Sequence, residues 1–102
     1  MTYSDALQRF LEALTNREAE HKQKNFPTLV VGSFSVMPGR KFDKVVKSDG
    51  GRYVYCFVRK SDGAIVKPAG WKAPEPRQYE RGNIYRTNPL EGTNVYGVDY
   101  LR

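Results

Sequence analysis

The chain has 102 residues and a formal net charge of +6, from 17 Lys and Arg residues against 11 Asp and Glu residues. That length predicts a single domain over residues 1–102. The longest aliphatic run is Leu29-Val30-Val31, so no membrane-spanning helix is expected, and the opening MTYSDALQ lacks the basic start of a signal peptide. The single cysteine excludes an internal disulfide and a cysteine-based zinc site, and it favours a reducing compartment.

The positive charge is confined to the middle of the chain. Residues 1–39 carry four basic and four acidic side chains, and residues 82–102 carry two of each. Residues 40–81 carry eleven basic and five acidic side chains, which accounts for the whole excess. Charge gathered in one segment produces a surface potential that attracts anions. The middle segment is therefore the candidate for contact with an anionic partner, and a solvated basic face is the alternative.

An amphipathic helix is predicted at the start of the chain, in the segment 1–25. Thr2 or Ser4 supplies an N-cap, and Asp5 lies where the helix dipole favours an acid. From residue 15 the segment is almost wholly polar, which predicts a solvated helical arm. We expect the apolar stripe of this helix to pack on a sheet, and the alternative is a contact between two copies of the chain. The stripe consists of Leu7, Phe10, Leu11 and Leu14.

A meander of antiparallel strands is predicted for residues 28–67. Asp49-Gly50-Gly51 and Ser61-Asp62-Gly63 are tight hairpin turns, because glycine tolerates the positive φ that such turns require. The expected strands cover residues 28–36, 41–48, 52–60 and 64–67.

The expected fold class is α+β, with the N-terminal helix packed on a small antiparallel sheet of about four to five strands. Residues 68–80 are predicted to form a proline-rich loop, in which Trp71 folds back over the sheet edge. Residues 81–102 are predicted to hold the C-terminal strands, the last of them over Thr93–Leu101.

The strand at residues 52–60 carries an unusual row of aromatic side chains. Strict alternation places Tyr53, Tyr55 and Phe57 on one face, and Val54, Cys56 and Val58 on the other. We expect the aliphatic face to lie under the helix and the aromatic face to lie in solvent. Rings beside cations are typical of surfaces that bind single-stranded nucleic acid or a nucleotide base. The alternative is that the aromatic row forms the core.

A set of cations and rings is therefore predicted to bind nucleic acid or a nucleotide, the cations holding phosphates and the rings stacking on bases. For the lysines, protection of sheet edges is the alternative role. The predicted binding residues are Lys44, Lys47, Arg52, Tyr53, Tyr55, Phe57, Arg59, Lys60, Lys67, Trp71 and Lys72.

Catalysis has little support in the sequence. His21 is the only histidine and lies in the polar arm, and Cys56 lies among valines, where a buried small side chain is expected. No glycine-rich phosphate loop is present, and the acids of the basic segment have no catalytic spacing. We therefore expect no enzymatic activity, no cofactor and no metal site.

One segment resembles a family of small uncharacterised proteins encoded by tailed bacteriophages. Residues 56–74, CFVRKSDGAIVKPAGWKAP, are similar to a hairpin that ends in Lys-Pro-Ala-Ser-Trp-Lys-Ala-Pro in that family, and Arg81-Gly82-Asn83-Ile84 matches the sequence that follows. Gly70 takes the place of the serine. The resemblance implies a phage origin and action in the cytoplasm of the infected host. It implies no activity.

Three hypotheses of function follow from these features. The leading one is a non-enzymatic binding protein whose basic, aromatic surface contacts nucleic acid. The second is a small homo-oligomeric anti-defence protein that sequesters a nucleotide signal in a closed pocket. The third is an inhibitor or structural partner whose basic face meets an acidic surface of a host or virion protein. None of them involves a membrane.

Overall fold

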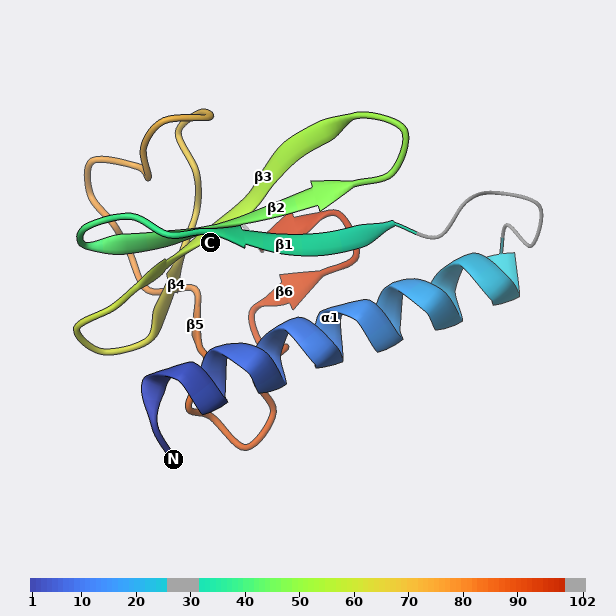
Figure 1. The fold of residues 1–102 in the computed structure, drawn as a ribbon, viewed down its shortest axis with the longest axis horizontal. Coiled ribbons are helices and arrows are strands. Elements are labelled where there is room, and N and C mark those ends of the chain that lie inside the picture. Colours follow the sequence, from blue (N-terminus) through green and yellow to red (C-terminus); the bar gives the residue numbers. More distant parts are fainter. Residues whose placement is uncertain (26–31, 99–102) are drawn as a thin grey trace.

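The structure, a computed structural model, describes residues 1–25 and 32–98. One helix packs on one face of a five-stranded antiparallel sheet with the strand order β1-β2-β3-β4-β5, which confirms the predicted α+β fold (Figure 1). A separate two-stranded hairpin, β6–β7, follows the sheet in the chain. The elements are α1 (Tyr3–Asn25), β1 (Ser33–Met37), β2 (Phe42–Ser48), β3 (Arg52–Arg59), β4 (Ala64–Val66), β5 (Gly82–Asn83), β6 (Thr93–Asn94) and β7 (Gly97–Val98).

The C-terminal segment differs from its prediction. A single strand over Thr93–Leu101 is wrong, because the chain reverses between β6 and β7. The side-chain oxygen of Asn94 accepts a hydrogen bond from the backbone N–H of Tyr96 at 2.8 Å, which stabilises this turn. Residues 28–31 of the predicted first strand, and residues 99–101 of the predicted last strand, lie outside the described residues.

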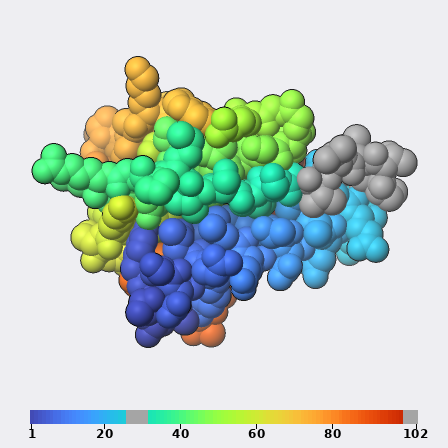
Figure 2. Space-filling model, in the orientation of Figure 1, coloured from blue at the N-terminus to red at the C-terminus, as the bar shows by residue number. Residues whose placement is uncertain are grey.

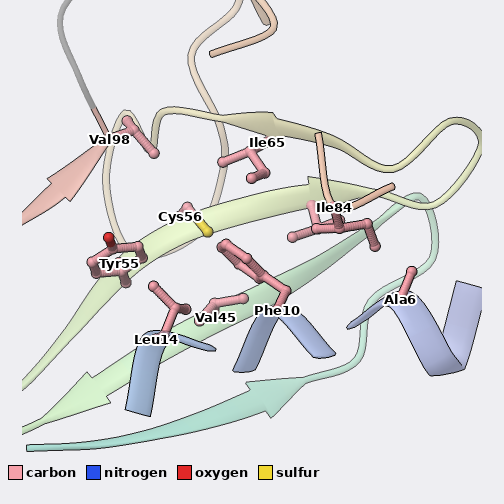
Figure 3. Packing of buried hydrophobic residues seen from close by; sticks show 10 residues of the cluster. Ala6, Phe10, Leu14, Val45, Tyr55, Cys56, Ile65, Ile84 and Val98 are labelled. Carbon is pink, nitrogen blue, oxygen red and sulfur yellow. The ribbon is translucent and has the colours of Figure 1, made fainter. Parts of the chain in front are cut away.

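Helix α1 begins and packs as its pattern predicts. The Thr2 hydroxyl accepts a hydrogen bond from the backbone N–H of Asp5 at 3.1 Å, which confirms Thr2 as the N-cap. Phe10 and Leu14 are fully buried against the sheet (Figure 3), and Leu7 and Leu11 lie half-buried beside them. Each buried apolar side chain of this size contributes about 1.5–3 kcal/mol to folding.

The predicted solvated arm begins at residue 15, but its first helical turn packs against the sheet. Glu18 lies one turn beyond Leu14 on the same face of α1 and is buried. The guanidinium of Arg17 donates hydrogen bonds to the Tyr55 hydroxyl at 2.7 Å and to the Asn94 carbonyl at 3.0 Å. Polar side chains in this turn therefore attach α1 to β3 and β6, and the prediction of a solvated arm is wrong here.

A β-bulge in β3 changes the predicted faces of the aromatic strand. Val45 pairs with Cys56 and Val46 pairs with Val54, so Tyr55 has no partner in the ladder. An extra residue in one strand turns consecutive side chains to the same side. Tyr55 and Cys56 consequently both point towards α1, and both are buried (Figure 3).

The expectation that the Tyr55 ring faces solvent is therefore wrong. Phe57 lies on the opposite face of the sheet, where it pairs with Lys44, and it is only 4% exposed. The tight turn expected at Asp49-Gly50 would pair Lys44 with Tyr55, and the observed pairing with Phe57 is shifted by two residues. The three-residue turn between Ser48 and Arg52 accounts for one of them and the bulge for the other. The aliphatic face under the helix is as predicted for Cys56 and Val58.

A buried ion pair joins α1 to β2. The ammonium of Lys47 lies 2.8 Å from a carboxylate oxygen of Glu18, and the two side chains are 4% and 2% exposed. Lys47 also donates a hydrogen bond to the carbonyl of Val95 at 3.1 Å. Burial by itself lowers the pKa of Lys47, but the hydrogen bond from Lys47 to Glu18 and the nearby negative charge raise the pKa above its ordinary value overall. Lys47 was predicted to hold phosphates, and its burial contradicts that role.

No helix in the described ranges is long and apolar enough to cross a membrane.

The Glu18–Lys47 pair gives a prediction about stability. Glu18→Gln leaves the buried Lys47 ammonium with only the more distant, partly exposed carboxylate of Asp49 at 3.9 Å, so the free energy of unfolding in urea is expected to fall by about 3–5 kcal/mol. The double variant Glu18→Leu with Lys47→Met removes both charges and is expected to recover most of this loss. A loss below about 1 kcal/mol for Glu18→Gln would contradict a buried, desolvated pair.

The buried titratable groups predict loss of stability at alkaline pH. Burial raises the pKa of the Cys56 thiol above its ordinary value of 9.0, and raises the pKa of the Tyr55 hydroxyl from 10.0 to about 12. The unfolded chain therefore ionises first, and the stability that is present at neutral pH is lost as the pH rises above about 9.

Urea midpoints measured from about pH 7 to about pH 11 test this dependence. Cys56→Ala is the control. In this variant the pH at which stability begins to fall is expected to move up to about pH 10, the ordinary pKa of tyrosine. A midpoint that stays constant over the whole range would refute the assignment.

Candidate nucleic-acid interface

Residues 67–75, here called the Trp71 loop, fold back on themselves like a hairpin. The backbone N–H of Glu75 donates to the Lys67 carbonyl at 2.9 Å, and that of Ala69 donates to the Ala73 carbonyl at 3.0 Å. Between these two hydrogen bonds, Pro68 and Pro74 lie opposite each other in an isolated antiparallel β-bridge, which brings the two halves of the loop together. The segment lies on the side of the sheet away from α1 (Figure 1).

Trp71 stands at the tip of this loop, over two cations of the sheet. The Lys44 ammonium is 4.4 Å from the centre of the Trp71 ring, and the guanidinium carbon of Arg52 is 5.6 Å from it. Cations at these distances are attracted by the ring quadrupole. Trp71 is 41% exposed, so the ring is held in place and still reachable from solvent. Trp71 was predicted to fold back over the sheet edge, but it lies over side chains of β2 and β3, which are interior strands of the sheet.

A hollow of about 290 Å³, here called the basic hollow, lies between the β1–β2 connection and the Trp71 loop. Its aromatic floor is formed by Phe42 and Phe57, whose rings meet edge to face with centres 6.2 Å apart. The green atoms of the β1–β2 connection project from one end of the molecule (Figure 2). The lining residues are Met37, Pro38, Gly39, Arg40, Lys41, Phe42, Lys44, Phe57, Lys72 and Pro74.

The charges around the basic hollow are all of one sign. Four cations line it and no acid does: Arg40, Lys41, Lys44 and Lys72. Within residues 1–25 and 32–98 no salt bridge is recorded for any of these four. A concave surface lined by one sign of charge concentrates the field and attracts anions.

A second hollow of about 440 Å³ continues this surface towards the β3–β4 turn. It shares Arg40, Lys41 and Phe42 with the basic hollow and adds Arg59 and Lys60. These two added cations are partly neutralised. The Arg59 guanidinium donates a hydrogen bond to a carboxylate oxygen of Asp62 at 2.8 Å, and this bond raises the pKa of Arg59. The Lys60 ammonium lies 3.6 Å from a carboxylate oxygen of Asp43.

The structure brings together five members of the predicted binding set, places two cations beside them and puts Tyr53 on an adjoining hollow. Tyr53 lines that hollow of about 290 Å³ with Arg52 and Trp71, and it also lines one of about 220 Å³ near β7 with Lys67. Tyr55 and Lys47 are inside the fold, so neither ring nor ammonium can meet a ligand there. The five that gather are Lys44, Arg52, Phe57, Trp71 and Lys72, with Arg59 and Lys60 beside them.

Arg40, Lys41 and Phe42 lie outside the set predicted from sequence, although they join the two hollows. One signal for them is visible in the sequence: two adjacent cations follow a Pro-Gly turn and precede an aromatic residue. A Cβ atom at Gly39 would collide with the carbonyl oxygen of Phe42, so glycine is required for the chain to turn here. That turn positions the wall of the basic hollow.

The groups considered for catalysis lie away from this surface. His21 meets the ring of Tyr96 edge-on, with centres 6.2 Å apart, and Cys56 is fully buried. In the part of the chain that the structure describes, no group of three or more His, Cys, Asp or Glu side chains could hold a metal ion.

A profile of the family of unknown function DUF7717 matches residues 1–98, so the chain belongs to this family. No curated protein and no solved structure matches the chain.

The contact between Lys44 and Trp71 gives a prediction that uses the only tryptophan of the chain. Lys44→Gln removes the closer cation, so Trp71 is expected to become more mobile and its fluorescence anisotropy to fall. The free energy of unfolding is expected to fall by about 0.5–1 kcal/mol. Lys24→Gln, an exposed lysine at the far end of α1, is the control and is expected to change neither quantity. Unchanged anisotropy in Lys44→Gln would contradict the contact.

Proposed function

We propose that the protein is a non-enzymatic nucleic-acid-binding protein, and that its contact surface is the sheet face opposite α1. The observation that carries the proposal is the basic hollow, where four cations that form no salt bridge with any residue of 1–25 or 32–98 surround an aromatic floor next to Trp71. Cations neutralise phosphates and rings stack on bases, so this combination fits a polynucleotide better than it fits a simple anion.

The distribution of charge over the molecule supports the same orientation. Asp5, Glu12 and Glu20 are exposed on α1, on the other side of the sheet. The four basic side chains of α1 balance its four acidic ones, so a phosphate backbone gains no net attraction there, whereas one that approaches the Trp71 loop meets only cations at the basic hollow.

We also propose that the protein is of phage type and acts in the cytoplasm of the infected host. The support is the similarity of residues 56–74 to the tailed-phage proteins, because this segment contains β4 and most of the Trp71 loop. The residues that carry the resemblance thus include Trp71 and most of the loop on which it stands.

Titration with oligonucleotides tests the binding proposal. DNA is expected to bind at low salt and to change the fluorescence of Trp71, with an affinity that falls as salt rises. The double variant Arg40→Gln with Lys41→Gln removes two phosphate contacts, so the slope of log K against log salt is expected to become shallower by about 1.4 for a single strand.

Lys22→Gln with Lys24→Gln is the matched control, because it removes the same charge from the end of α1. It is expected to leave the slope unchanged. Absence of binding to any oligonucleotide at low salt would end the proposal. Equal effects of the two double variants would place the contact elsewhere on the molecule.

A further inference from the structure

The shape of the basic hollow adds to the proposed function and rests on it: we infer that the ligand is a single strand, one base of which leaves its stack and enters the hollow. The apolar surface of the floor is offered mainly by the half-buried Phe42, because Phe57, which packs edge to face against it, is itself only 4% exposed. Met37, Pro38 and Pro74 extend this apolar lining up the walls. The charged groups therefore surround an apolar space.

An apolar space ringed by cations matches one nucleotide rather than a phosphate chain alone. A base has two apolar faces, and it gains contact area when it lies against aromatic side chains. Its neighbouring phosphates then lie at the rim, within the field of Arg40, Lys41 and Lys72. A bare polyanion would leave the floor of the hollow unused.

Duplex DNA cannot supply a base in this way without being opened. In a duplex the faces of each base are covered by its neighbours and its pairing edge is occupied, so extrusion has an unstacking cost of a few kcal/mol in the general case of base flipping. A single strand has bases that are already free to leave the stack. The hollow therefore selects against duplex without reading any sequence.

The walls of the hollow are fixed before a ligand arrives. The β1–β2 connection contains Gly39, at which a side chain would collide with the backbone of Phe42. On the opposite side, Pro74 and Lys72 belong to the Trp71 loop, which its own hydrogen bonds and the contact between Trp71 and Lys44 hold over the sheet. A preformed hollow avoids the entropy cost of ordering loops on binding.

Three probes of equal length test the inference on the unmodified protein: a mixed-sequence DNA strand, the same strand annealed to its complement, and a strand composed of abasic residues. The abasic strand keeps the phosphates and the flexibility and lacks only the bases. The complete strand is expected to bind at least about fivefold more tightly than either of the others at one salt concentration.

The outcomes separate this inference from the proposed function. Equal binding of strand and duplex, tighter binding of duplex, or equal binding of the abasic and complete strands would overturn the inference, while the basic surface would remain a site for nucleic acid. If none of the probes binds at low salt, both proposals fail together.

A variant pair locates the base within the hollow. Phe42→Leu keeps an apolar side chain and removes the ring, so the preference for the complete strand over the abasic strand is expected to fall, with no change in the salt slope. Tyr96→Leu is the control, because Tyr96 is a 75% exposed ring that packs against His21 of α1. A preference that Phe42→Leu leaves intact, in a folded variant, would exclude this hollow as the base site.

Discussion

The β-bulge at Tyr55 is the constraint on which the rest of the structure depends. It places Tyr55 and Cys56 on the same side of the sheet, where both pack against α1. Tyr55 then lies within reach of Arg17 and accepts its hydrogen bond, which connects α1 to β3. Because the alternation is shifted beyond the bulge, Phe57 falls on the opposite face beside Lys44, where it becomes the floor of the basic hollow. One extra residue thus decides which rings pack against α1 and which lie under the basic hollow.

The elements of the fold that follow from local patterns were predictable. The apolar stripe and the Thr2 cap define α1, and the glycine turns at Gly50 and Gly63 have the positive φ that their hairpins require. The bulge was not predictable, because β-branched and aromatic residues surround Tyr55 on both sides in β3 and nothing marks the extra position. The role of Glu18 was hidden for a related reason. A charged residue in a polar segment looks solvated until its partner, Lys47, is found 29 positions away in the chain.

The sequence predicts the chemistry of the candidate site better than it predicts which residues form the site. A local excess of cations next to aromatic residues is a property of composition, so the sequence indicates the kind of ligand and the middle of the chain as its location. Which residues form the site depends on the strand register and on where the loops lie. Trp71 and Lys44 meet only because the Trp71 loop folds over the sheet, and Arg40 joins them only because the β1–β2 connection forms the facing wall. Tyr55 and Lys47 carry the right chemistry for the ligand but face the wrong side of the sheet.

In the proposed function, the side of the molecule that carries α1 maintains the fold, and the side that carries the Trp71 loop meets the ligand. Backbone amide chemical shifts, recorded by NMR while a DNA strand is added at low salt, test that division most directly. The account predicts that the shifts which change with added DNA belong to the β1–β2 connection, to Lys44 and its neighbours in β2, and to the Trp71 loop, while α1 is unaffected. Changes gathered on the outer face of α1, or spread evenly over the molecule, would contradict it.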